Sequence, residues 1–267
     1  MKHIVIMGAT SGIGLRVAEI YATAGWRVGV AGRKDDVMKE LQTRFPKQVE
    51  WEHIDITRKD SVTRLENLIK KLGGMDIYFH VSGIGFQNPA VITDEEVATV
   101  ETNVVGFTRM IDTAFRYFRD VNSRKGHIAA VTSIAGTKGI GELASYSSSK
   151  KFQQTYLQAL EQLSHMQELD IKFTDIRPGW IRTPLLDPDR EYPMTMELEG
   201  VVPQIIRALI NKTRMVVIDR RWAVGYQLWR MIPERLWANM DIHVSSPATG
   251  AEKAENTVTE ITESKPE

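Results

Sequence analysis

The sequence contains no cysteine. This excludes disulfide bonds, thiolate metal ligands and a cysteine nucleophile. The six histidines do not cluster at the spacing of metal ligands, so no metal site is predicted. No apolar run approaches the roughly 20 residues that a membrane-spanning helix needs. The first apolar run, residues 4–7, is also too short for a signal peptide. We therefore expect a cytoplasmic protein.

The chain also has no excess of charge of either sign. Lys plus Arg and Asp plus Glu each number 34, so the formal net charge is zero. Without a basic or acidic excess, no broad electrostatic argument points to nucleic acid as a partner. A charged content of 25% and an apolar content of 42% are ordinary for a globular protein. The length of 267 residues suits one large α/β domain.

Short apolar runs alternate with helical patterns through residues 1–219. The runs expected to form strands are 4–7, 27–31, 49–54, 75–81, 126–132, 171–176 and 215–218. Strands that alternate with helices predict a parallel sheet with right-handed crossovers. The fold class expected is α/β: a doubly wound, Rossmann-type sheet of seven strands, with helices on both faces, in a single domain.

The character of the chain changes after residue 219. Residues 220–244 read as a short helical extension in which Trp and Tyr recur at roughly helical spacing among arginines. Packing over a pocket or at a subunit interface is the favoured interpretation, because soluble monomers rarely expose such a patch. The alternative is contact with a membrane surface. Residues 245–267 hold five Glu and almost nothing apolar, so a disordered acidic tail is predicted.

A glycine-rich turn follows the first predicted strand and precedes a helix. It reads Gly8-Ala9-Thr10-Ser11-Gly12-Ile13-Gly14. Glycines let the backbone approach a pyrophosphate, and the N-terminus of the helix offers unpaired N–H groups to it. The second strand ends at Gly32-Arg33-Lys34, without an acid at its tip. An arginine there suits the 2′-phosphate of NADP(H), whereas Asp35 or Asp36 can cap the next helix or, in a shifted register, reach the ribose of NAD(H).

Tyr146 and Lys150 lie four residues apart in a segment with a helical pattern. Positions four apart share one face of a helix, which places the phenol beside the ammonium. A neighbouring positive charge favours the phenolate and lowers its pKa from about 10. A phenol tuned in this way can exchange a proton with a substrate oxygen.

These features together resemble the short-chain dehydrogenase/reductase family over residues 1 to about 219. The motifs that carry the resemblance are the glycine turn from Met7 to Gly14, Asp55-Ile56, Asn103, Ser133, the Tyr146/Lys150 pair and Pro178-Gly179-Trp180-Ile181-Arg182-Thr183. The family's Thr before the glycine turn is replaced by Met7. Its Asn-Asn-Ala-Gly motif appears as His80-Val81-Ser82-Gly83.

The resemblance implies an enzyme that transfers a hydride between NADP(H) and a carbonyl compound or secondary alcohol. The implied catalytic residues are Asn103, Ser133, Tyr146 and Lys150, with Asn103 holding a water molecule that relays protons from Lys150. The implied cofactor-binding residues are Gly8, Thr10, Ser11, Gly12, Ile13, Gly14, Arg33, Lys34, Asp55, Ile56, Ser82, Gly83, Tyr146, Lys150, Pro178, Gly179, Ile181 and Thr183. A homodimer and a small-molecule substrate are expected as well.

The substrate is expected to be an apolar or mixed carbonyl compound or secondary alcohol. The residues predicted to surround it are Phe86, Ile140, Leu143, Leu185, Leu186, Tyr192, Met194 and Met196. Two other functions fit parts of the pattern. Ser147 and Lys150 match the Ser-x-x-Lys motif of serine acyltransferases and β-lactam hydrolases, although the companion motifs are absent. A non-catalytic dinucleotide sensor is the other alternative, but it has no need of a tuned phenol.

Overall fold

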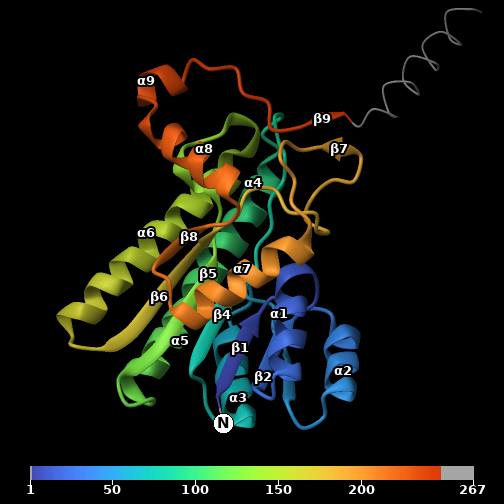
Figure 1. Cartoon of the computed structure of the whole chain (residues 1–267), viewed down its shortest axis with the longest axis vertical. Helices are drawn as coiled ribbons and strands as arrows, with labels where there is room; N and C mark the ends of the chain where they lie inside the picture. Colours follow the sequence, from blue (N-terminus) through green and yellow to red (C-terminus); the bar gives the residue numbers. More distant parts are fainter. Residues whose placement is uncertain (1, 248–267) are drawn as a thin grey trace, which may run out of the picture.

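The computed structural model describes residues 2–247, and its centre is a parallel sheet of seven strands. The strands are β1 (His3–Met7), β2 (Arg27–Gly32), β3 (Val49–His53), β4 (Ile77–His80), β5 (Lys125–Val131), β6 (Asp170–Arg177) and β8 (Met215–Val217). They lie in the order β3-β2-β1-β4-β5-β6-β8 (Figure 1). The predicted doubly wound sheet is confirmed, and no strand end differs from its predicted position by more than two residues.

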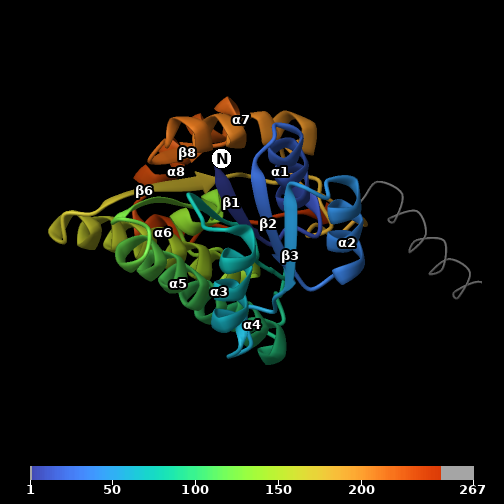
Figure 2. The ribbon, with the colours of Figure 1, turned by 90° about the horizontal axis from the view of Figure 1, so that it is seen from below.

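Helices cover both faces of the sheet, as Figure 2 shows. Their bounds are α1 (Gly12–Thr23), α2 (Asp35–Arg44), α3 (Ser61–Leu72), α4 (Thr93–Val100), α5 (Phe107–Asp120), α6 (Ala144–Met166), α7 (Leu198–Asn211), α8 (Arg220–Met231) and α9 (Glu234–Trp237). The buried side chains of α1, α2 and α7 belong to one apolar cluster, and those of α3, α5 and α6 to another. Within residues 2–247, no helix is long and apolar enough to span a membrane.

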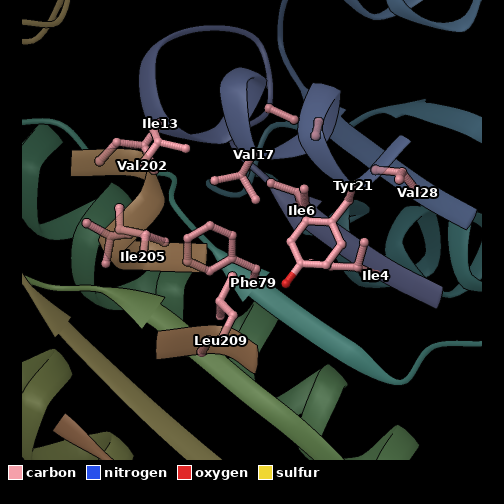
Figure 3. Packing of buried hydrophobic residues seen from close by; sticks show 14 of the residues in the cluster. Ile4, Ile6, Ile13, Val17, Tyr21, Val28, Phe79, Val202, Ile205 and Leu209 are labelled. Carbon is pink, nitrogen blue, oxygen red and sulfur yellow. The ribbon is translucent and has the colours of Figure 1, made fainter. Parts of the chain in front are cut away.

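The two clusters are separated by the sheet because successive side chains of a strand point to opposite faces. Ile4 and Ile6 of β1 join the first cluster, whereas Val5 and Met7 join the second. Figure 3 shows side chains of α1 and α7 packed over Ile4, Ile6 and Phe79. Burial on both faces explains why the strands read as continuous apolar runs rather than as alternating ones.

The order of the strands reverses at β1. The chain runs from β1 outward to β2 and β3, and then returns to place β4 on the other side of β1. In doubly wound sheets, the connections at such a point leave in opposite directions and open a crevice beyond the carboxyl ends of the strands. In Figure 1 these ends point toward α8, α9, β7 and β9.

A second, two-stranded sheet was not predicted. Arg190–Glu191 (β7) pairs in antiparallel register with Ser246–Pro247 (β9). The side chain of Ser245 also donates to Gln87 Oε1 at 2.7 Å. The boundary of the predicted tail at residue 245 is therefore wrong by three residues, because two-residue strands leave no periodic signal in the sequence. The remainder of the predicted tail, residues 248–267, lies outside the described residues.

The helical extension packs against the body of the protein. Trp222 lies so close to Gly179 that a Cβ atom there would come within 2.3 Å of the indole. Trp237 Nε1 donates to the Gly139 carbonyl at 2.6 Å. These contacts agree with the favoured interpretation of residues 220–244.

A buried ion pair ties α8 to the end of β6. The Arg177 guanidinium contacts Asp175 Oδ2 at 2.6 Å, and both side chains are largely buried. The other carboxylate oxygen accepts from Thr132 Oγ1 at 2.5 Å. Arg177 also donates to the Tyr226 hydroxyl of α8 at 2.6 Å. The guanidinium therefore connects the sheet to the extension.

We expect Arg177→Ala to lower the free energy of unfolding by about 3–5 kcal/mol, because the Asp175 carboxylate stays buried without its counter-ion. Arg221→Ala is the matched control. Arg221 also pairs with an aspartate two residues earlier, Asp219, but on the surface. Exposed pairs contribute about 0–1 kcal/mol. Urea unfolding of the two variants measures the difference, and equal losses would contradict the structural role of the buried pair.

Candidate active site

A single cavity lies beyond the carboxyl ends of the central strands and joins two kinds of surface. One end is formed by the glycine turn after β1 and by the ends of β2 and β3. The other end is formed by the loops after β4, β5 and β6, together with α8 and the segment before β9. Residues that the sequence analysis singled out in distant parts of the chain thus meet where the order of the strands reverses.

The glycine turn forms a phosphate cradle. Gly8, Thr10, Ser11, Gly12 and Ile13 line the cavity at the start of α1. Gly8 adopts φ +94°, and a Cβ atom on it would lie 2.6 Å from the Ser82 nitrogen. The N-cap Ser11 makes no side-chain capping bond, and the first turn of α1 has no acidic residue. The free N–H groups and the helix dipole therefore fit a pyrophosphate. Gly14 is buried and lies behind the cradle, outside the cavity lining.

The adenosine end carries one cation. Arg33, Asp55 and Ile56 line the cavity, but Lys34 does not; its backbone caps α2. The Asp55 carboxylate accepts from the Thr57 N–H and hydroxyl at 3.0 and 2.8 Å. Burial opposes its charge, but these bonds and the Arg33 charge outweigh it and lower the Asp55 pKa.

The two aspartates that follow Arg33 lie away from the lining. Asp35, the first residue of α2, has its Oδ1 2.7 Å from Nδ1 of His53, the last residue of β3. Neither Asp35 nor Asp36 lines the cavity. The register that would bring an acid to the ribose is therefore not adopted.

The hydroxyl-bearing residues Ser133 and Tyr146 both line the cavity and lie next to each other. Ser133 follows β5, and its Oγ accepts from the Ala135 N–H at 3.1 Å. Tyr146 lies in the first turn of α6. Burial raises the pKa of the Tyr146 phenol, although its hydrogen bond with Ser133 acts in the opposite direction. The expected lowering of this pKa is therefore wrong, because burial outweighs the hydrogen bond with Ser133.

Lys150 is buried one helical turn after Tyr146. Its Nζ donates to the Val131 carbonyl and to Gln153 Oε1, each at 3.2 Å. It also lies 5.6 Å from the centre of the Tyr146 ring. Burial lowers the Lys150 pKa to about 8, although the Asp175 carboxylate raises it. The predicted Tyr–Lys pairing on one helical face is present.

Asn103 lies in a π-helical segment, Glu101–Gly106, between α4 and α5. Its side chain accepts from the Ile84 N–H at 3.0 Å and donates to the Ile84 carbonyl at 2.7 Å. It also donates to Ser149 Oγ at 3.1 Å. All three bonds of the Asn103 side-chain amide are thus made to other groups of the protein, and Asn103 does not line the cavity. The visible role of its side chain is to hold the loop after β4 against α6, which differs from the expected water site.

Two glutamines on α6 escaped the sequence-based prediction. Gln153 Nε2 donates to the Asn103 carbonyl at 2.9 Å while its oxygen accepts from Lys150. Gln154 Nε2 donates to the Ser133 carbonyl at 2.7 Å. They lie three and four residues after Lys150, and this spacing could have predicted that both glutamines share a helical face with the lysine. They connect three of the four predicted catalytic residues.

The departure at His80 is accommodated inside the sheet. His80 is fully buried, with Nδ1 3.1 Å from the Tyr78 hydroxyl and Nε2 3.1 Å from the Ser82 carbonyl. Burial and the Lys150 charge lower its pKa to about 3, so the ring is neutral. Ser82 and Gly83 line the cavity. His80 and Val81 thus stand at the positions of the family's two asparagines, and the bonds of His80 are made within the protein.

The substrate end is mainly apolar and aromatic. Of the predicted residues, Phe86, Ile140, Leu143, Leu185, Leu186 and Tyr192 line it. Met194 and Met196 do not, and Met196 belongs to the first apolar cluster. Pro178, Gly179, Ile181 and Thr183 also line the cavity. The lining also includes Trp180 and, from the extension expected over a pocket or at an interface, Trp222, Trp229, Ile242, His243 and Val244, none of which was singled out individually.

The described residues contain no cluster of three His, Asp or Glu side chains that is able to hold a metal ion. What the cavity does contain is a phosphate cradle continuous with two hydroxyl groups and a buried ammonium. This arrangement is able to bind a dinucleotide and to exchange a proton with a substrate oxygen.

Comparison with known proteins points to one family. A sequence profile described as short chain dehydrogenase matches residues 2–193. An uncharacterized oxidoreductase of Staphylococcus saprophyticus is 31% identical over 191 residues, which cover 69% of this chain and 80% of that protein.

Two solved structures share the fold. An alcohol dehydrogenase from the archaeon Thermococcus sibiricus, complexed with 5-hydroxy-NADP, has a TM-score of 0.69 at 20% identity and covers 81% of this chain and 95% of its own. A 3-ketoacyl-(acyl-carrier-protein) reductase from Brucella melitensis, complexed with NADH, has a TM-score of 0.69 at 21% identity and covers 81% and 94%. The match to the profile over most of the chain, together with the geometry of the cavity, shows that this protein belongs to the short-chain dehydrogenase family of oxidoreductases.

Proposed function

We propose that the protein interconverts an apolar carbonyl compound and the corresponding secondary alcohol with NADP(H). The observation that carries this proposal is the continuity of the cavity, in which the phosphate cradle leads directly to Ser133 and Tyr146. A hydrolase of the Ser-x-x-Lys type is disfavoured, because its nucleophile would be Ser147. This residue is buried, its Oγ accepts from the Ile140 N–H, and it does not line the cavity.

A bound nicotinamide dinucleotide supplies the hydride in reduction and accepts it in oxidation. The protein's own residues bind the substrate oxygen and move its proton. Tyr146 donates its phenolic proton to the oxygen during reduction and removes it during oxidation. Ser133 donates a hydrogen bond to the same oxygen and stabilises the charge that develops on it. Lys150 supplies the buried positive charge that favours the phenolate form of Tyr146 when the proton leaves.

The preference for NADP(H) over NAD(H) rests on the end of β2. Arg33 lines the cavity, whereas Asp35 is engaged by His53 and Asp36 does not line the cavity. A guanidinium binds a phosphate through two parallel charge-assisted bonds. The two structural neighbours carry 5-hydroxy-NADP and NADH, so they support a nicotinamide dinucleotide in general. Our proposal of NADP(H) rather than NAD(H) therefore rests on Arg33.

The Tyr146→Phe variant tests the proton donor. We expect it to bind NADPH normally but to lose turnover by at least ~10²-fold, the usual scale of general acid–base catalysis. The Tyr156→Phe variant is the control, because Tyr156 lies on the same helix but bonds to Asp112 at 2.5 Å, outside the cavity. The assay is NADPH oxidation, measured over a set of steroid, sugar, quinone and small ketone substrates. Near-normal turnover in Tyr146→Phe would refute the assignment.

The Arg33→Ala variant tests the cofactor. Hydrogen bonds to charged groups contribute about 1.5–3 kcal/mol each. Loss of one should therefore lower the ratio of kcat/KM for NADPH to that for NADH by about ten- to a hundredfold. Arg58→Ala is the matched control, since Arg58 also acts on Asp55 but does not line the cavity. A wild-type preference for NADH, or an unchanged ratio in Arg33→Ala, would overturn the NADP(H) assignment.

A further inference from the structure

The segment before β9 crosses the substrate end of the cavity as a strap, which we define as residues 241–245. Ile242, His243 and Val244 of this strap line the same cavity as Tyr146 and Ser133. Val244 is buried in a small apolar cluster with Ala135, Ile140 and Leu143. The strap thus supplies one wall of the substrate end, although it lies about a hundred residues beyond Tyr146 in the sequence.

One carboxylate holds the strap in place. Glu142 Oε1 is 2.7 Å from His243 Nδ1, and Oε2 accepts from the Val244 N–H at 3.2 Å. Gln87 Nε2 also donates to Oε2 at 2.7 Å, and the other amide atom of Gln87 accepts from Ser245 Oγ. Glu142 belongs to a 3₁₀ turn that ends directly before α6. The same turn therefore carries the group that holds the strap and leads into the helix of the catalytic tyrosine.

We propose that Glu142 is a positioning residue for substrate binding, which closes the cavity by fixing the strap against the turn before α6. The effect on substrate binding rests on the proposed function, whereas the contacts between Glu142 and the strap do not depend on it. Glu142 does not line the cavity itself, so its effect on a substrate passes through Ile242 and Val244. Because these two side chains are apolar, the substrate portion that they contact is apolar as well.

The charges around the strap make its closure depend on pH. Burial alone would raise the Glu142 pKa, but the bonds from His243, Val244 and Gln87 outweigh it and lower this pKa. The bond to Glu142 and the charge of Asp241 raise the pKa of the exposed His243 ring. Within residues 2–247, Glu142 and Asp241 are the charged groups that act on this ring.

The direction of the pH effect follows from the raised His243 pKa. The imidazolium stabilises the closed strap fully below the ordinary histidine pKa of about 6.5. This contribution is lost as the pH rises through the raised pKa of His243 in the closed strap. The strap should therefore open more readily in alkaline solution.

Hydrogen exchange of the Val244 amide, corrected for the intrinsic effect of pH, tests the proposal without a substrate. We expect Glu142→Ala to speed this exchange at least about tenfold, equivalent to ~1.4 kcal/mol. Glu142→Gln, which keeps an acceptor oxygen, should recover part of the protection. His243→Asn keeps a donor near Nδ1 but does not titrate, so it should remove the pH dependence of the protection.

His53→Asn is the matched control, because His53 and Asp35 form a pair of the same 2.7 Å length far from the strap. It should leave the exchange of Val244 unchanged. Unchanged exchange in Glu142→Ala would overturn the proposal. Equal acceleration in Val244 and in the amides of β1 would also overturn it, because it would show a general loss of stability.

Kinetics with 2-octanone and acetone supply the second measurement. Glu142→Ala should raise KM for 2-octanone about tenfold, keep kcat within about twofold, and leave KM for acetone and the dissociation constant of NADPH nearly unchanged. Equal changes for both ketones would contradict a role through the strap. If neither ketone is turned over by the wild-type protein, the proposed function fails for these substrates, while the exchange measurement still decides the role of Glu142.

Discussion

Burial of the Lys150 ammonium is the constraint on which the active site depends. A buried cation is costly unless it is well hydrogen-bonded. Here the Val131 carbonyl and Gln153 provide the bonds, and Asp175 provides a charge of opposite sign. Gln153 in turn bonds to the carbonyl of Asn103, and Asp175 is held by Arg177 and Thr132. The requirements of one ammonium therefore link the end of β5, the π-helical segment, α6 and β6.

The same constraint extends to the substrate end. Arg177 neutralises Asp175 and also bonds to Tyr226, which fixes α8 beside the cavity. Trp222 and Trp229 of α8 then form part of the aromatic wall. Trp229 packs against the apolar cluster that contains Val244, and Glu142 fixes the strap there. The half of the cavity that contains Ser133, Tyr146 and Lys150 thus comes from strand ends and α6, whereas the apolar half includes α8 and the strap, which a few polar bonds hold in place.

The fold was predictable from the sequence because strands buried on both faces read as apolar runs, and helices between them show their own period. The glycine turn and the Tyr146/Lys150 pair were predictable because each lies in a local pattern with a fixed spacing, whereas Ser133 was found through the resemblance to the family. The contacts of Gln153, Arg177 and Glu142 were not, because each joins residues that only the folded chain brings together. The direction of the Tyr146 pKa was also missed, since burial leaves no mark on the spacing of four residues.

The most direct test of the account is the fate of an isotopic label. Reduction of 2-octanone with NADPH that carries deuterium at both C4 positions of the nicotinamide should yield 2-octanol with one deuterium on the carbinol carbon. Mass spectrometry of the product, with the reaction in ordinary water, measures the label. An alcohol free of deuterium would contradict direct hydride transfer in this cavity, and with it the central claim.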